Sequence, residues 1–229
     1  MVRVGTFLRG VAATGVLSAL LYAAPVSAAS NSSKDNASRH MQMPGARIRQ
    51  RPQISIDAIR ALNLIMRTEN QEDPHYLESR RVVSNGVAAR LSLDAAELHR
   101  AWSRAPRDHQ IAVLSALTQL GVPYIEGKED SYVKMDCSGL MWFSWRTAGV
   151  DMPRQAVSQL DIRMRVDREN AIVGDVVGEG THVQMYLGVG LAMIHAPFDG
   201  KFVKFKIMST EQAARVAWTN PSNIATFRL

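Results

Sequence analysis

The hydrophobic periodicity of the chain changes at Gly121-Val122-Pro123, and this change restricts the fold more than any other feature. The preceding stretch, 108–120, has apolar residues at helical spacing, with Gly121 as a stop signal. A further helix is predicted over 136–148, and after it come short strand-like pieces with tight turns. Helices followed by consecutive strands predict an α+β fold with an antiparallel sheet.

Two stretches before residue 108 also have helical spacing, one beginning at Ser55, which we expect to cap it, and one over 91–102. The stretch 76–90 between them is ambiguous, because Ser84-Asn85-Gly86 has the composition of a turn. The expected apolar faces carry Ile56, Ile59, Leu62 and Met66 in the first stretch, and Leu91, Ala95, Leu98 and Trp102 in the second. The predicted strands are 174–177, 182–187, 192–195, 202–207 and 224–229.

The start of the chain has the succession of segments that is typical of a secretory signal peptide. A basic segment without acids (1–10) is followed by an apolar run (11–24) and by small residues up to Ala28. A membrane anchor is the alternative, but the run is shorter than the roughly 20 residues that span a bilayer. We therefore expect a signal peptide (1–28), a disordered linker (29–54) and a mature protein outside the cytoplasm, with no stable membrane insertion.

Charge narrows the choice of partners. The formal net charge is +6, and it falls to +4 when Arg3 and Arg9 leave with the signal peptide. This excess favours anionic polymers that carry phosphate or carboxylate groups. No dense basic run interleaved with aromatic residues is present, so we do not expect nucleic acid as a partner.

Cys137 is the only cysteine of the chain, so no disulfide can form within it. Asp136 is a favourable N-cap, which places Cys137 in the first turn of the predicted helix. Unpaired N–H groups and the helix dipole favour a thiolate there. The charge of Asp136 opposes that ionisation, so we expect its carboxylate to face backbone N–H groups or a substrate ammonium. The alternative is a buried, inert thiol.

Two histidines fall where they can serve this thiol. Strand alternation puts His182, Gln184 and Tyr186 on one face, and a turn centred near Gly188 and Val189 returns His195 opposite His182. Such a pair suits a base and a residue that fixes its tautomer. Two polar residues on a wet sheet face are the alternative. A metal site is not expected, because no Cys or carboxylate has zinc-ligand spacing. We interpret the remaining histidines, His40, His75, His99 and His109, as ordinary surface or edge residues.

The stretch from Leu120 to about Ile207 resembles the NlpC-type cell-wall peptidases, papain-like enzymes that cut peptidoglycan stem peptides. The resemblance rests on pieces that stand in the family's order. They are Leu120-Gly121-Val122-Pro123-Tyr124, Asp136-Cys137-Ser138-Gly139-Leu140, Ala148-Gly149-Val150, Met152-Pro153-Arg154, Gly174-Asp175-Val176-Val177, His182-Val183, Tyr186-Leu187-Gly188 and Ile194-His195-Ala196.

The resemblance implies a papain-like fold with the nucleophile-bearing helix packed on an antiparallel sheet. A small helical region (55–107) would precede the peptidase domain (108–229). Cys137 would be the nucleophile, His182 the general base and His195 the orienting residue. The free amino end of the stem peptide would be held by Tyr124, Asp136 and Ser138. No cofactor is implied.

The implied function is a secreted cysteine endopeptidase, acting in the bacterial wall or periplasm on the bond between D-glutamate and a diamino acid. Two departures concern specificity: one Gly in 125–128 where the family usually has a pair, and Gln184 where it usually has Gly. Two alternatives stay open, an inactive peptidoglycan-binding protein on the same fold and an amidase or transpeptidase with the same thiol chemistry. We also expect that the helices of 55–107 could cover the cleft.

Overall fold

The structure is a computed structural model that describes residues 51–227, which lie within one compact unit. The predicted signal peptide (1–28), residues 29–50 of the predicted linker and His40 lie outside the described residues. In the described part, no helix is long and apolar enough to cross a membrane.

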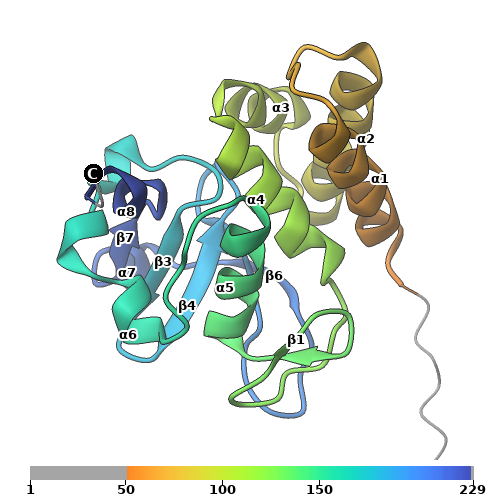
Figure 1. The fold of residues 1–229 in the computed structure, drawn as a ribbon. Helices are drawn as coiled ribbons and strands as arrows, with labels where there is room; N and C mark the ends of the chain where they lie inside the picture. The colour runs from red at the N-terminus through yellow and green to blue at the C-terminus, as the bar shows by residue number, and fades with distance from the viewer. Residues whose placement is uncertain (1–50, 228–229) are drawn as a thin grey trace, which may run out of the picture. The chain divides into compact units, whose positions relative to one another are not determined.

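The N-terminal half is helical (Figure 1). Its elements are α1 (Gln53–Arg67), α2 (Pro74–Leu91), α3 (Ala95–Arg104) and α4 (Arg107–Thr118). Figure 1 shows α4 between the N-terminal helices and α5, and α4 is accordingly buried over most of its circumference. The apolar positions predicted to face inward, Ile111, Leu114 and Leu117, are buried. The N-terminal helices, α4 and the sheet share one hydrophobic core.

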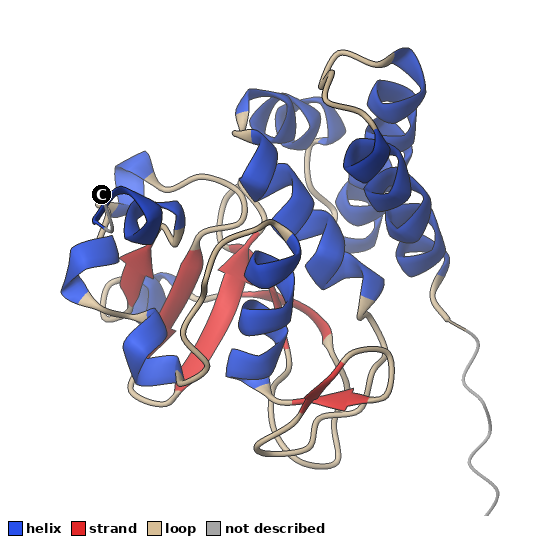
Figure 2. Cartoon of the chain, viewed as in Figure 1, coloured by secondary structure: helices blue, strands red, loops and turns tan. Residues whose placement is uncertain are grey.

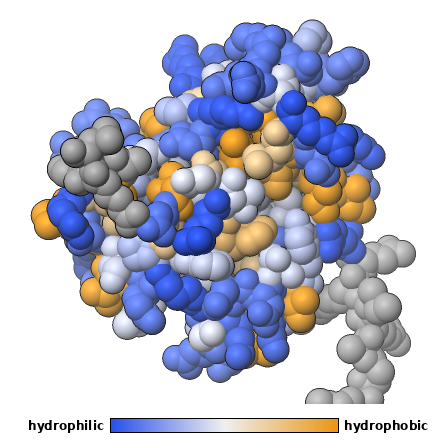
Figure 3. Space-filling view, viewed as in Figure 1, coloured by the Kyte–Doolittle hydropathy of each residue, from blue (hydrophilic) through white to orange (hydrophobic). Residues whose placement is uncertain are grey.

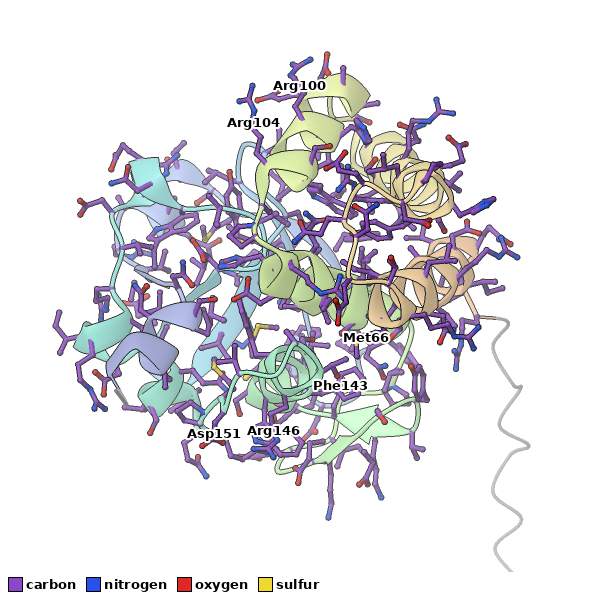
Figure 4. All side chains as sticks on the ribbon, turned by 45° about the horizontal axis from the view of Figure 1, so that its top comes forward. Met66, Arg100, Arg104, Phe143, Arg146 and Asp151 are labelled. Carbon is purple, nitrogen blue, oxygen red and sulfur yellow. The ribbon has the colours of Figure 1, made fainter. Side chains whose placement is uncertain are left out.

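The predicted face of α1 was wrong for two of its four residues. Ile56 and Met66 are 40% and 51% exposed, whereas Leu62 packs against the core. The fully buried positions of the helix are instead Ala58, Ala61 and Ile65. Met66 lies near the surface in Figure 4, where Arg100 and Arg104 also project outward from α3. Small residues on the inner face allow α1 to approach α2 and α4 closely, which the apolar spacing alone did not reveal.

Ser55 does not cap α1, as had been expected. The helix begins two residues earlier, and the Ser55 hydroxyl donates to the carbonyl oxygen of Thr118 at 2.6 Å inside the core. This bond joins the start of α1 to the end of α4. Ser55 therefore forms a tertiary contact between two helices, which no local sequence pattern predicts.

The expected break at Ser84-Asn85-Gly86 does not occur, and α2 is continuous. Asp73 caps it by accepting from the Tyr76 N–H at 2.9 Å. Gly86 packs closely against α1, since a Cβ there would lie 3.1 Å from Ile54 Cγ1. The glycine marks a close approach of two helices rather than a turn.

The C-terminal half contains the antiparallel sheet, which confirms the α+β prediction (Figure 2). The described strands have the order β6-β5-β4-β3-β7. They are β3 (Val176–Glu179), β4 (His182–Tyr186), β5 (Ala192–His195), β6 (Lys204–Ile207) and β7 (Ala217–Thr219). A two-stranded hairpin, β1 (Glu129–Asp130) and β2 (Lys134–Met135), precedes α5 (Cys137–Thr147). The short helices are α6 (Ala156–Gln159), η1 (Ile162–Met164), η2 (Arg168–Asn170), α7 (Thr210–Ala213) and α8 (Ser222–Phe227).

The end of the chain differs from the prediction. The expected strand 224–229 is helical as far as Phe227, and the edge strand β7 was missed. β7 pairs with β3 through Trp218 opposite Val177. Its pairing partner lies some 40 residues earlier in the chain, so no hairpin signal marked it.

The sheet has two different faces. Val183, Met185 and Ile194 belong to the main core, which also contains α5. The opposite face carries a smaller core of Val177, Met193, Met208, Ala213 and Trp218. Alternation along β4 and β5 puts His182, Gln184 and His195 on this second face.

Candidate active site

Local sequence places the thiol at the start of α5. Asp136 is the N-cap, and its Oδ1 accepts from the Gly139 N–H at 2.6 Å, as predicted for its carboxylate. A side chain at Gly139 would collide with the Lys128 carbonyl oxygen, so this turn requires glycine. Cys137 is 5% exposed and lies at the wall of a cleft.

The cleft has a volume of about 480 Å³. It brings together Cys137 and the three predicted substrate contacts, Tyr124, Asp136 and Ser138. The other lining residues are Glu126, Gly127, Glu129, Arg154, Gln155, Ala156, Val157 and Thr181. None of these belongs to α1–α4, so these four helices, which had been expected to cover the cleft, do not line it. The face of the molecule that Figure 3 shows is mostly hydrophilic, with apolar residues in small separate groups.

The sulfur of Cys137 lies against the backbone on both sides of His182. Its Sγ is 3.5 Å from the Thr181 carbonyl oxygen, and the Val183 N–H is also directed at it. Burial raises the pKa of the Cys137 thiol and the Asp136 charge adds to this, which together outweigh the N–H groups around the sulfur. The expected thiolate was therefore wrong for the resting protein, in which the group is a neutral thiol.

The side-chain rings of His182 and His195 are in contact. His182 Nε2 is 3.4 Å from His195 Nδ1, and the ring centroids are 5.6 Å apart. They are diagonal neighbours rather than a directly opposed pair, because the β4–β5 register sets Met185 against Ile194. The turn between β4 and β5 is centred one residue later than predicted. Each residue of β4 is therefore opposite a position two residues further along the chain than expected. Contact survives because side chains on one face reach diagonal neighbours.

Both imidazoles favour the neutral form. Burial, and then the charge of Lys206, lowers the pKa of His182. Burial lowers the pKa of His195 to about 3, with further effects from His182, Lys206 and Lys204. Nε2 of His182 faces His195, and among the described residues no hydrogen bond joins either ring to the Cys137 sulfur. The Nε2 atom of His195 is buried without a partner among the described residues.

The role of Arg154 in this site was not predicted from the sequence. Its guanidinium binds both carboxylate oxygens of Asp136, at 3.1 and 2.8 Å, the Ser138 hydroxyl at 2.7 Å and Glu129 at 2.9 Å. Burial raises the pKa of Asp136, but Arg154 and the Gly139 N–H outweigh it and hold the carboxylate ionised. The Met152-Pro153-Arg154 segment of the resemblance was the available signal.

Tyr124 lies on the wall of the cleft, held by a backbone bond from its N–H to the Lys201 carbonyl at 2.8 Å. Burial, with smaller effects from Cys137 and Asp136, raises the pKa of its hydroxyl to about 12. The phenol is therefore a neutral donor at physiological pH. This suits a hydrogen bond to a substrate carbonyl or carboxylate.

His109 is not the surface residue that was expected. Its ring is fully buried, with Nδ1 2.8 Å from the Val173 carbonyl oxygen and Nε2 3.1 Å from Asn220 Oδ1. Its Nδ1 is also 3.7 Å from Asp175, whose pKa burial raises to about 7. The histidine ties α4 to the segment before β3 and to the segment before α8. No described group of three or more His, Cys, Asp or Glu residues is arranged to hold a metal ion.

A comparison with models of protein families matches residues 121–220 to the NlpC/P60 family. Residues 121–220 therefore form an NlpC/P60-like region. The match confirms the resemblance predicted over 120–207. The NlpC/P60 region makes up a little under half of the chain, and the helices α1–α4 lie outside it.

Curated relatives of the NlpC/P60 region have the names of peptidases. The bifunctional muramidase/DL-endopeptidase CwlT of Bacillus subtilis is 32% identical over 90 residues, covering 36% of this chain and 27% of that protein. The gamma-D-glutamyl-L-lysine dipeptidyl-peptidase of Bacillus cereus is 35% identical over 99 residues, covering 40% and 29%. The peptidoglycan endopeptidase RipA of Mycolicibacterium smegmatis is 28% identical over 117 residues, covering 44% and 23%. The matches span less than a third of each of these relatives.

Solved structures of the same family are also similar. NlpC1 from Trichomonas vaginalis has a TM-score of 0.43 at 28% identity, covering 50% of this chain and 44% of that chain. A mutated form of the Resuscitation Promoting Factor Interacting protein RipA has a TM-score of 0.45 at 25% identity, covering 52% and 66%.

Proposed function

We propose that this protein is a secreted cysteine endopeptidase that hydrolyses peptidoglycan stem peptides, at the bond between D-glutamate and a diamino acid. One observation carries the proposal. The Cys137 sulfur lies in a cleft against the backbone that flanks His182, and the His182 ring is paired with His195. The names of the relatives support the substrate class.

The reaction begins from a neutral thiol and a neutral imidazole. His182 Nδ1 takes the proton as the Cys137 sulfur attacks the amide carbonyl carbon and forms the S–C bond. The backbone N–H groups of Cys137 and Ser138, at the start of α5, donate to the resulting oxyanion. His182 then gives its proton to the leaving amine as the C–N bond breaks. Water hydrolyses the thioester, which releases the acid and regenerates the thiol.

His195 acts as a positioning residue in this scheme. His182 accepts a proton at Nδ1 only if its own proton is on Nε2, and that N–H then donates to His195 Nδ1. In that arrangement His195 carries its proton on Nε2, the atom without a partner in the described part of the chain. The His195 ring thus selects the tautomer in which His182 is a base.

The acyl side of the substrate occupies the cleft of Cys137. Tyr124, Asp136 and Ser138 hold the free amino end of the stem peptide, and the paired guanidinium of Arg154 keeps Asp136 and Ser138 in place. The remaining expectations extend this proposal. A signal peptide (1–28) directs the protein to the bacterial wall or periplasm, the net positive charge favours anionic wall polymers, and a helical region (55–107) precedes the peptidase domain (108–229).

Incubation of the mature protein with purified muropeptides tests the proposal. Mass spectrometry should detect new fragments cut after D-glutamate with the wild type and none with Cys137→Ala. Identical, intact muropeptide profiles from both proteins would exclude the proposed hydrolysis.

A peptidoglycan-binding protein without catalysis is the second candidate, and one observation favours it. The Cys137 thiol is bonded to the Thr181 carbonyl rather than to an imidazole, and burial raises its pKa. This candidate predicts that the wild type sediments with purified sacculi and releases no soluble peptide. Release of peptide that depends on Cys137 would eliminate it.

A further inference from the structure

The two active-site histidines share their face of the sheet with two lysines of β6. Lys206 is opposite Met193 in the register of β5 and β6, and the exposed Lys204 is opposite His195. Both lysines therefore project from the face that carries His182. Lys206 is half-buried and lines a recess of about 130 Å³ together with the His182 ring. The imidazole thus lies beside a cation that water screens only in part.

The placement of Lys206 does not serve the stability of the fold. Its ammonium makes no ion pair or hydrogen bond with the described residues. A half-buried cation without an anion loses hydration and gains no attraction in return. An unfavourable charge next to reactive groups points to a role in their chemistry.

We propose that Lys206 keeps His182 in the neutral form that accepts a proton, and so extends the activity of the site to acidic pH. Lys206 is then a positioning residue, because it acts through the base and does not touch the reacting atoms. The inference rests on the proposed function, since it concerns the base of the same reaction.

Repulsion between like charges gives the effect its direction. Protonation of His182 would place a second positive charge beside the Lys206 ammonium, whereas the neutral ring carries none. Burial is the largest cause that lowers the pKa of His182, and the charge of Lys206 is the next. The same lysine lowers the pKa of His195, after burial and His182. At a given acidic pH, a larger fraction of His182 is therefore free to accept the thiol proton.

The other titratable groups around His182 do little to offset Lys206. Glu179 of β3 is paired with His182 in register, but its side chain is exposed and screened by water. Arg215, which follows α7 and also lines the recess, is a second exposed cation. From α5, the Cys137 thiol lies against the backbone beside His182 and is neutral.

This role predicts a change at acidic pH only. A ring that resists protonation is also a weaker base, so the lysine does not raise the rate at every pH. Above the pKa of His182 the ring is neutral with or without Lys206, and removal of the charge should not lower kcat/KM. Below that pKa, removal of the charge should lower kcat/KM, because more of His182 is already protonated.

Titration of His182 by NMR tests the inference without a substrate. The mature Cys137→Ala protein is isotope-labelled at histidine, and the His182 signal is identified by its loss in His182→Gln. We expect Lys206→Met to raise the titration midpoint of His182 by about 0.5–1 pH unit. Lys206→Arg keeps the charge and should leave the midpoint near that of the parent protein.

Lys204→Met is the matched control, since it removes an exposed lysine of the same strand that does not line the recess. It should move the midpoint of His182 less than Lys206→Met does. An unchanged midpoint in Lys206→Met, or an equal shift in Lys204→Met, would overturn the inference. Circular dichroism melting of each variant establishes that a shifted midpoint is not loss of fold.

The pH profile of kcat/KM separates this inference from the proposed function. With a stem-peptide substrate, Lys206→Met in the Cys137 protein should lose about 3- to 10-fold on the acidic limb and keep its activity at pH 8. A raised midpoint in a protein that cleaves no stem peptide retains the effect of Lys206 on His182 and rejects the endopeptidase. Cleavage with an unchanged midpoint and an unchanged acidic limb retains the endopeptidase and rejects the inference.

Discussion

His182 Nε2 lies 3.4 Å from Nδ1 of His195, and this contact leaves Nδ1 as the nitrogen of His182 that does not face the second ring. The register of β4 and β5 makes the two rings diagonal neighbours on one face of the sheet. A proton on Nε2 of His182 leaves Nδ1 as a lone-pair acceptor. With both rings neutral, the contact of the pair bears on the tautomer of His182 rather than on its charge.

We expect His195→Ala to lower kcat on the order of 10²-fold while KM changes little, because His182 loses its orienting partner. His195→Asn should recover part of the loss, since an amide oxygen can accept from Nε2 of His182. Steady-state kinetics with a fluorogenic stem peptide measures both. His75→Ala, at an exposed histidine of α2, is the control. An unchanged kcat in His195→Ala would contradict the assigned role.

Asp175 provides a test based on pH. Burial raises its pKa from 3.8 to about 7, so the neutral acid stabilises the fold below pH 3.8 and this contribution is lost as pH rises to about 7. Asp175→Asn is neutral at every pH. It should gain stability over the wild type as pH increases, up to about 4 kcal/mol at pH 8, the free-energy equivalent of the shift. Denaturant titrations at pH 4, 6 and 8 measure the difference.

The exposed Asp199→Asn serves as the control for that series and should show no gain that grows with pH. A difference between Asp175→Asn and wild type that stays constant from pH 4 to 8 would mean that the buried carboxyl is ionised throughout.

Arg154 should be required for the stability of the cleft. Arg154→Leu leaves the buried Asp136 carboxylate without its two guanidinium bonds, and we expect a loss of about 1–3 kcal/mol in the free energy of unfolding. Asp136→Asn added to it should recover part of that loss, which a double-mutant cycle measures. Arg163→Leu breaks an exposed pair with Asp161 and should have no measurable effect. Additive effects of Arg154→Leu and Asp136→Asn would mean that the pair is not coupled.

The inner face of α1 can be tested with one residue type. Ile65→Ala should cost about 2–5 kcal/mol of unfolding free energy, because it opens a cavity in the core. Ile56→Ala, at a 40% exposed position of the same helix, should cost less than about 1 kcal/mol. Equal losses in thermal or denaturant unfolding would support the face originally predicted from spacing.

The parts of this site that could be predicted depend on short-range signals. An N-cap directly before Cys137 and strand alternation around His182 are both readable within a few residues. The positions that were missed depend on distant partners. Arg154 acquires its role from Asp136 and Glu129, and His109 from Val173 and Asn220, none of which is adjacent in the sequence.

Errors in the fold have the same origin. Gly86 has the composition of a turn residue but serves the close approach of α1 and α2, and Ser55 looks like a cap but bonds to the end of α4. The ionisation of Cys137 was misjudged because the helix terminus is visible in the sequence and the extent of burial is not. Local pattern thus located the candidate residues, whereas their protonation depends on tertiary packing.

The burial of α4 on nearly all sides has a consequence for how much chain is needed to make a working fragment. A truncation that starts at Arg107 would turn the side of α4 that meets α1 into bare apolar surface exposed to water. Such a fragment would hold the whole family-matched region and yet tend to self-associate. The minimal soluble piece should therefore begin before Gln53.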